Sequence, residues 1–120
     1  MAVNDRGASV IIGIGDVYAQ IPRREEVREL MRSTQARIRE QPGCIGYEFA
    51  ESLEEPGRFI VIQQWRDEAA LEEHYRSATF AQYQTAITDQ IVRASELRLY
   101  TMQGGLRPVE ASPSDPRLDD

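Results

Sequence analysis

The chain has 120 residues, of which 41% are hydrophobic and 28% are charged, as is typical of one ordinary globular domain. Acidic residues outnumber basic ones by 20 to 14, and the net charge of −6 argues against nucleic acid binding, which needs a basic surface. The single cysteine, Cys44, excludes an intrachain disulfide. No apolar run approaches the ~20 residues that span a bilayer, and the first residues lack a secretion-signal pattern. We therefore expect a cytoplasmic protein that does not bind membranes.

The first predicted element is a strand from Val10 to Gln20. Its two faces are both apolar, which indicates a strand covered from two sides. Gly13 and Gly15 leave one face bare, so another segment can approach the backbone there. Asp16 lies in the middle of the other, otherwise apolar face.

A helix is predicted next. Pro22 suits its first turn, and Gln41-Pro42-Gly43 ends it. Its buried face is marked by residues at helical spacing: Val27, Leu30, Met31, Thr34 and Ile38.

Two alternating segments then predict an antiparallel hairpin. The first runs from Cys44 to Ala50 and the second from Arg58 to Arg66, on either side of the turn signal Glu54-Glu55-Pro56-Gly57.

The last third of the chain predicts two helices and a strand. Asp67 can cap a short helix that carries the only histidine, His74. Ser77 can cap a longer one, and a final strand runs from about Ser95 to Met102. The apolar stripe of the longer helix is Phe80, Tyr83, Ile87 and Ile91. We expect residues 1–8 to be a flexible N-terminus and residues 104–120 a disordered tail.

The order strand, helix, strand, strand, helix, strand predicts an α+β fold of the ferredoxin-like kind, with an antiparallel sheet and helices on one face only. The apolar residues on the other face then need cover. A second copy of the chain would supply it, so we expect a homodimer.

The segments Pro42-Gly43-Cys44-Ile45-Gly46-Tyr47-Glu48-Phe49, Trp65 to His74 and Ser77-Ala78-Thr79-Phe80 resemble the antibiotic biosynthesis monooxygenase family. The resemblance covers about Ser9 to Met102, and we place the domain at residues 9–103. It implies a dimeric α/β barrel with one pocket per subunit, between the helices and the sheet. In the best-known branch it also implies oxygenation by O₂ without flavin, haem or metal. There a phenol or anthrone loses a proton, and its carbanion passes an electron to O₂.

Cofactors are not expected. The haem-degrading branch of this superfamily uses an asparagine, a tryptophan and a histidine at positions that here hold Asp16, His74 and about Gln84, so the resemblance disfavours haem degradation. One cysteine and one histidine cannot form an N/S metal site. We expect neither a cofactor nor a metal, with O₂ as the co-substrate.

The candidate catalytic residues are His74 and Asp16. Neutral imidazole accepts a proton near neutrality, so His74 is the candidate general base, and Asp16 could orient it or hold a substrate hydroxyl. The alternatives are a helix histidine that only forms a hydrogen bond and an aspartate that faces solvent or pairs with an arginine. The candidate substrate-binding residues, which could equally be ordinary core or dimer packing, are Trp65, Tyr47, Phe49, Tyr75, Phe80 and Tyr83.

The sequence thus favours a cofactor-independent monooxygenase that acts on a small phenolic, quinol or anthrone-like aromatic. Two alternatives stay open. One is an isomerase or lyase that uses the same base, which dependence on oxygen would distinguish. The other is a non-enzymatic dimeric protein that binds a ligand or responds to stress.

Overall fold

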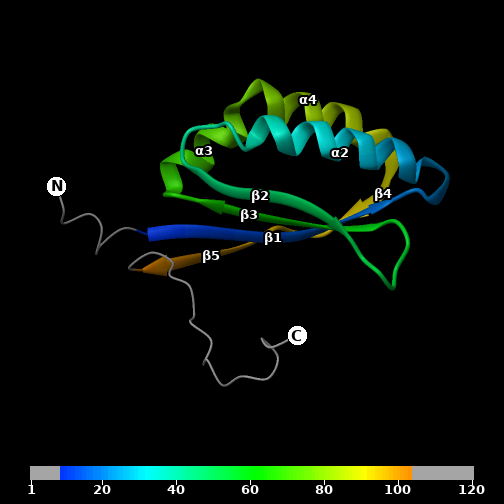
Figure 1. Ribbon diagram of the computed structural model, residues 1–120, viewed down its shortest axis with the longest axis horizontal. Coiled ribbons are helices and arrows are strands. Elements are labelled where there is room, and N and C mark those ends of the chain that lie inside the picture. Colours follow the sequence, from blue (N-terminus) through cyan, green and yellow to red (C-terminus); the bar gives the residue numbers. More distant parts are fainter. Residues whose placement is uncertain (1–8, 104–120) are drawn as a thin grey trace, which may run out of the picture.

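A computed structural model describes residues 9–103, which form an antiparallel sheet with helices across one face (Figure 1). The expectations for residues 1–8 and 104–120 lie outside this part of the chain. The elements in order are β1 (Ser9–Ala19), the 3-10 turn η1 (Ile21–Arg23), α2 (Arg24–Ile38), β2 (Cys44–Glu51), β3 (Arg58–Trp65), α3 (Glu68–Arg76), α4 (Ala78–Ile87), the 3-10 turn η2 (Thr88–Gln90), β4 (Ile91–Ala94) and β5 (Arg98–Gln103). The predicted ferredoxin-like α+β architecture is confirmed.

The sheet is built around β1. Its strand order is β2-β3-β1-β4, and β5 pairs with the other end of β1, on the edge that β4 occupies further along. The predicted hairpin is present, with Tyr47 of β2 opposite Gln63 of β3, and Ile14 of β1 opposite Ile62 of β3. All the pairings are antiparallel, so local turns and helix crossovers suffice to connect them.

The structure from Ile91 to Gln103 differs from the predicted last helix and strand. The strand expected from Ser95 to Met102 is two strands, and Ile91, expected on a helix, begins β4 opposite Ala19. Two hydrogen bonds from Gln20 hold the turn before it, from the backbone N to the Gln90 carbonyl at 2.9 Å and from Nε2 to the Asp89 carbonyl at 3.0 Å. The spacing of Ile91 suits a helix, but the free edge of β1 offers backbone partners that a longer helix would leave unpaired.

Both predicted helix caps are present. The Asp67 carboxylate accepts a hydrogen bond from the Ala70 backbone N at 2.9 Å, and the Ser77 hydroxyl accepts one from Phe80 N at 3.1 Å. Gly43 ends the segment after α2 at φ +82°, and a Cβ there would lie 2.4 Å from that of Ala70. Only glycine fits this close approach of the β2 start to α3.

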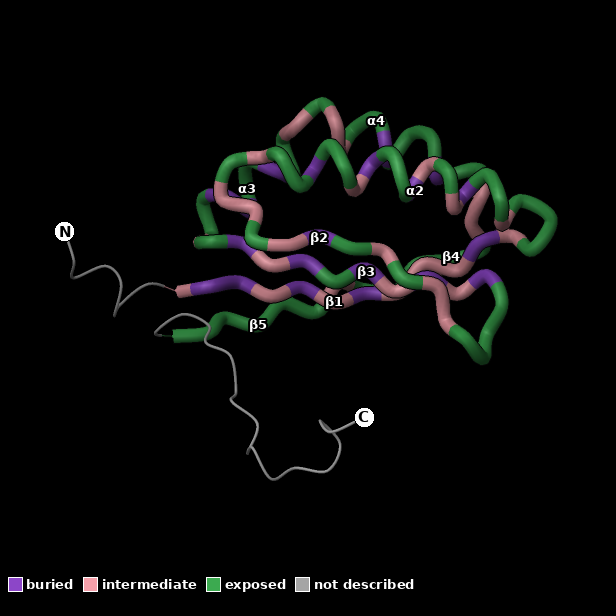
Figure 2. The backbone as a smooth tube through the Cα atoms, in the orientation of Figure 1, coloured by how far each residue is buried: buried purple, intermediate pink, exposed green. Residues whose placement is uncertain are grey.

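The core lies between the helices and the sheet (Figure 2). One cluster of buried residues surrounds Trp65 and a second surrounds Met31. The bare patch predicted at Gly13 and Gly15 is filled from the C-terminal segment, because Leu99 packs on Gly13 and Leu97 on Gly15. No helix within residues 9–103 has the length and apolar character needed to cross a membrane.

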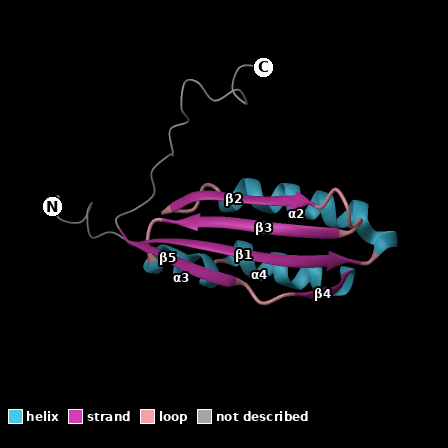
Figure 3. Cartoon of the chain, turned by 90° about the horizontal axis from the view of Figure 1, so that it is seen from below, coloured by secondary structure: helices cyan, strands magenta, loops and turns pink. Residues whose placement is uncertain are grey.

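The opposite face of the sheet carries no helix in the described part of the chain, as the view from below shows (Figure 3). Side chains alternate along each strand, so residues in register with Ile14 and Ile12 lie on this open face. Its apolar members include Ile62, Tyr100 and Met102, which are 40%, 47% and 40% exposed.

Candidate active site

A cavity of about 270 Å³ lies between the helices and the covered face of the sheet. Its wall includes β1, β2 and β3, both later helices and the segment that joins β4 to β5. The lining residues are Gly15, Asp16, Val17, Tyr47, Phe49, Val61, Gln63, Tyr75, Phe80, Tyr83, Gln84, Ala94, Ser95 and Leu97. Most of this wall is aromatic or aliphatic, which suits an apolar ligand with few polar groups.

The structure brings together five of the six residues expected to bind substrate: Tyr47, Phe49, Tyr75, Phe80 and Tyr83. Their rings form two groups: Phe49 contacts Tyr47 and Tyr83, and Tyr75 contacts Phe80. The centroids of Tyr47 and Phe49 are 5.5 Å apart, and those of Tyr75 and Phe80 are 5.0 Å apart. These spacings are typical of favourable edge-to-face pairs, so the aromatic wall is a packed surface.

Trp65, the sixth, lies elsewhere. Its side chain is completely buried, is absent from the cavity wall and packs in the core, where its indole N–H donates to Gln63 Oε1 at 2.7 Å. The surroundings of Trp65 therefore match core packing, the alternative to substrate binding that the sequence left open. Trp65 contacts His74, since the two rings are stacked with centroids 4.8 Å apart.

His74 lies behind the aromatic wall. It is 1% exposed, and its ring centroid is 5.5 Å from Tyr47, 5.2 Å from Tyr75 and 5.0 Å from Phe80. Burial lowers its pKa from the ordinary value of 6.5 to about 4, since the apolar surroundings disfavour the imidazolium ion. The ring is therefore neutral near pH 7 and has a lone pair available.

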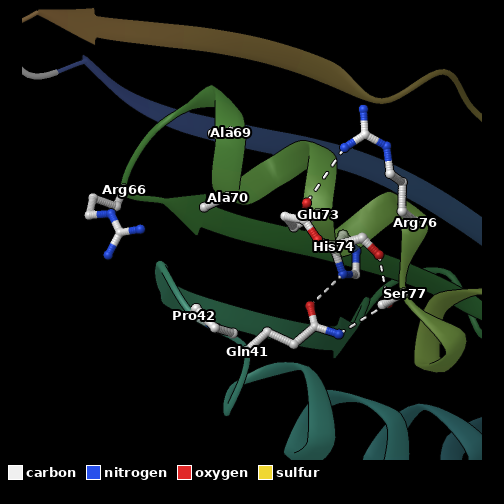
Figure 4. Close-up of a pocket in the computed structure, with 9 residues that line it drawn as sticks. All are labelled: Gln41, Pro42, Arg66, Ala69, Ala70, Glu73, His74, Arg76 and Ser77. Atoms are coloured by element: carbon white, nitrogen blue, oxygen red, sulfur yellow. Dashed lines mark hydrogen bonds and ion pairs between the residues drawn. The ribbon is translucent and has the colours of Figure 1, made fainter.

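The two ring nitrogens of His74 differ. Nδ1 is hydrogen-bonded to Gln41 Oε1 at 2.9 Å, whereas Nε2 is buried and has no hydrogen-bond partner among the described residues. Gln41, His74 and Ser77 also line a second hollow of about 330 Å³, between α3 and the turn after α2 (Figure 4). His74 thus lines this hollow and also packs against three rings of the aromatic cavity, those of Tyr47, Tyr75 and Phe80.

Asp16 does not orient His74 as the sequence suggested. Asp16 borders the cavity, but its carboxylate points away from it, to the open face of the sheet, where it is paired with Arg58 at 3.1 Å from Nη2 and 3.2 Å from Nε. His74 lies over the covered face, where Trp65 points. Because side chains alternate along a strand, the two groups lie on opposite sides of the sheet. Asp16 therefore matches the alternative given by the sequence, an aspartate that pairs with an arginine.

Sequence reasoning missed Gln63 and Gln41. Gln63 is 3% exposed and lines the cavity, and its Oε1 accepts the Trp65 indole proton. It stands between Val61 and Trp65 on an inward strand face, and a polar residue at such a position is a signal that could have found it. Gln41 had no such signal, because its role depends on where α3 packs.

The cavity's tyrosines are neutral hydrogen-bonding groups. Burial raises the pKa of Tyr47, Tyr83 and Tyr75 above the ordinary value of 10. Each hydroxyl therefore keeps its proton at neutral pH and can donate to an oxygen of a ligand. Across residues 9–103 no group of three or more His, Cys, Asp or Glu side chains is placed to hold a metal ion.

Comparison with known proteins agrees with this architecture. Residues 11–86 match the antibiotic biosynthesis monooxygenase family, and the chain belongs to that family. A conserved protein from Methanosarcina mazei Go1 has a similar structure, with a TM-score of 0.72 and 21% identity over 83% of this chain and 97% of that one. Protein SO0527 from Shewanella oneidensis is similar at a TM-score of 0.73 and 21% identity, over 78% of this chain and 91% of that one. At these identities the likeness shows the fold alone.

A sequence relative is the uncharacterised protein sll1783 of Synechocystis sp., which is 28% identical over 90 residues. The match covers 75% of this chain and 61% of that relative. The chain thus spans less than two thirds of the length of this relative.

Proposed function

We propose that the protein is a cofactor-independent monooxygenase that oxidises a small phenolic, quinol or anthrone-like aromatic with O₂. The observation that carries the proposal is the aromatic cavity with a neutral, buried imidazole directly behind its wall. Family membership supports the same class of reaction. The cavity volume of about 270 Å³ is close to the lower limit of ~300 Å³ for ligand pockets, which favours a compact flat substrate.

In this proposal the protein contributes an apolar cavity, hydrogen bonds and a proton acceptor. The substrate's ring lies against Phe49, Phe80 and Tyr83, and its hydroxyl donates to Nε2 of His74. Because Nε2 is buried, a ligand reaches it only when a ring packed on His74 moves, and Tyr75, at 38% exposed, is the most exposed of these rings.

Proton transfer from the substrate hydroxyl to His74 is favoured by the ion pair that it produces. An imidazole of pKa about 4 is a weak base in the empty site. Once the proton has moved, the substrate anion lies beside the imidazolium, and an opposite charge at this distance favours the charged form of both. Tyrosine hydroxyls that stay protonated can donate to the same anion.

The oxidation then balances without a further reductant. The substrate carbanion gives an electron to O₂, the two radicals combine at the ring carbon, and loss of water leaves a new carbonyl. One oxygen atom enters the product and the other leaves as water, so a CH₂ group becomes C=O. The role of the protein is to hold this sequence in an apolar cavity.

Oxygen uptake by flavin-free protein, treated with a chelator, tests the proposal on anthrone and on a small set of quinols, with the autoxidation rate subtracted. We expect uptake above background and one ¹⁸O atom from ¹⁸O₂ in the product. The His74→Phe variant, which keeps an aromatic ring stacked on Trp65 but has no base, should lose most of this activity. Uptake that is equal in both proteins would contradict the role of His74.

The absence of uptake on every substrate, together with proton exchange beside a carbonyl under anaerobic conditions, would replace oxygenation with an isomerase or lyase reaction. The same cavity and base serve both reactions, so dependence on O₂ is the measurement that distinguishes them. Binding of these aromatics with neither reaction would indicate a ligand-binding protein.

We also propose a homodimer that buries the open face of the sheet. Ile62, Tyr100 and Met102 are exposed there on neighbouring strands, and a second copy would remove them from water. Sedimentation equilibrium should give twice the chain mass of 13.7 kDa.

A further inference from the structure

A closed hydrogen-bond network joins His74 to the start of α4 (Figure 4). Gln41 Oε1 lies 2.9 Å from His74 Nδ1, and Gln41 Nε2 donates to the Ser77 hydroxyl at 3.1 Å. The same hydroxyl donates to the His74 carbonyl at 2.6 Å and accepts from Phe80 N at 3.1 Å. The side chains of Gln41, His74 and Ser77 are thus linked in one ring of bonds, which closes through the His74 backbone carbonyl.

Counting protons in this network assigns the tautomer of His74. A serine hydroxyl has one proton, and that of Ser77 is committed to the His74 carbonyl. Ser77 can then only accept from Gln41, so the amide nitrogen of Gln41 faces Ser77 and its oxygen faces His74. An amide oxygen can only accept, so Nδ1 of His74 must carry the proton and Nε2 the lone pair.

The reversed network is less favourable. If Gln41 turned its amide over, it would donate to a bare Nδ1, and the proton of His74 would move to Nε2. That would bury an N–H group with no partner among residues 9–103, and it would break the short Ser77–His74 hydrogen bond. Buried N–H groups without a partner are rarer in proteins than acceptors without one, because the N–H loses its full hydration.

We propose that Gln41 is a positioning residue that holds His74 with its proton on Nδ1, and that the site therefore selects ligands that donate a hydrogen bond to Nε2. This inference rests on the proposed function and adds to it the kind of ligand that the cavity selects. A phenol or enol O–H satisfies the buried lone pair, whereas a ligand that offers only acceptors, such as an ether, leaves it unpaired. Sites built around one buried polar group discriminate strongly against ligands that cannot pair with it.

The tautomer can be measured without any activity. His74 is the only histidine of the chain, so protein labelled with ¹⁵N-histidine and freed of any histidine tag gives one pair of imidazole signals. In a long-range ¹H–¹⁵N correlation spectrum at pH 7, we expect Nδ1 to have the chemical shift of a protonated nitrogen and Nε2 that of a bare one. The opposite assignment would overturn the proposal.

Three variants test whether Gln41 sets this state. Gln41→Met has similar length but no amide, and we expect its spectrum to show a mixture of the two tautomers. Gln41→Glu keeps an acceptor oxygen for Nδ1 and should restore the proton there; its carboxylate cannot donate to Ser77 and favours the imidazolium ion, so only the Nδ1 signal is read in this variant. The control is Gln82→Met, the same substitution at an exposed position of α4, which should leave the spectrum of His74 unchanged. A Gln41→Met spectrum identical to that of the unaltered protein would show that Gln41 does not position the ring.

Ligand selectivity is tested with phenol and its methyl ether, anisole, titrated while the Nε2 signal is followed. We expect phenol to bind at least about tenfold more tightly, a difference of ~1.4 kcal/mol, and this ratio to fall below about threefold in Gln41→Met. Equal binding of the two ligands would overturn the selectivity. Because neither measurement requires turnover, they can succeed even if the oxygenation proposal fails.

Discussion

The two faces of the sheet differ in what covers them and in the chemistry they offer. On the covered face, α3 and α4 enclose an aromatic cavity and a neutral imidazole. On the open face, Ile62, Tyr100 and Met102 are exposed, and Asp16 is paired with Arg58. The same strands supply both faces, because successive side chains point in opposite directions.

This contrast assigns different roles to residues that are adjacent in sequence. Burial on the covered face changes the pKa of His74 and of three tyrosines, whereas the open face exposes the apolar side chains that the proposed dimer would bury. Chemistry and assembly are therefore separable by mutation, and four predictions test that separation.

The largest effect is expected from Trp65→Ala. Removing a completely buried indole should lower the free energy of unfolding by about 3–5 kcal/mol, because the core cannot collapse around the lost volume. The matched variant on the open face is Tyr100→Ala, at a position 47% exposed, and we expect it to cost the isolated protomer less than about 1.5 kcal/mol. Urea unfolding measures both. Equal costs would mean that the faces do not differ in burial as described.

The second effect is the pH dependence of stability. Below about pH 6.5 the unfolded chain binds a proton at His74, whereas the folded protein does so only near pH 4. The contribution of His74 to the free energy of unfolding is therefore fully present above pH 6.5. It is lost as the pH falls towards 4, by about 3 kcal/mol at most. The ring's titratable neighbours, Tyr47 and Tyr75, stay neutral throughout this range.

Comparison with His74→Phe isolates this contribution. Carboxylates also make stability fall on acidification, and that part is common to both proteins. We expect the difference in unfolding free energy between the two proteins to change by about 2–3 kcal/mol between pH 7 and 4.5. A constant difference would mean that His74 titrates normally in the folded state.

The third effect is on turnover with an accepted substrate. His74→Ala should lower kcat at least about tenfold, or ~1.4 kcal/mol in barrier, since it removes the proton acceptor. Asp16→Asn, which alters the open face, should change kcat by less than about threefold. If the aspartate variant lost as much activity as the histidine variant, the assignment of Asp16 to the open face would have to be abandoned.

The smallest effect on the folded protomer is expected from Ile62→Glu. A charge at a position 40% exposed should change the stability of the isolated protomer by only about 0.5 kcal/mol. In a dimer that buries this face, however, the carboxylates would lose their hydration, and sedimentation should show a shift to the chain mass. Glu40→Gln, at an exposed position just after α2 on the helix side of the sheet, is the control and should leave the assembly unchanged.

Local signals in the sequence predicted most elements of the fold. Asp67 and Ser77 cap their helices as expected, Gly43 makes its turn, and alternation from Cys44 to Trp65 predicted the hairpin. The exception is Ile91, because the competition between continuing a helix and joining the edge of β1 is decided by a strand more than 70 residues away.

The candidate site could be predicted only in part. The aromatic residues that line the cavity were found from their spacing, since each element carries its own apolar stripe. The orienting partner of His74 could not be found in this way. Asp16 was plausible by chemistry, but the partner is Gln41, a residue of ordinary appearance in the turn after α2.

The sequence by itself determined the types of residue that could do chemistry, the helix caps and turns, and the ferredoxin-like order of elements, because these depend on contacts between near neighbours in the chain. The tertiary structure alone decided which nitrogen of His74 has a hydrogen-bond partner, which face holds the Asp16 carboxylate, and that Trp65 stacks on the imidazole. Those properties arise from burial and from hydrogen bonds between distant segments, and both exist only once the helices have packed on the sheet.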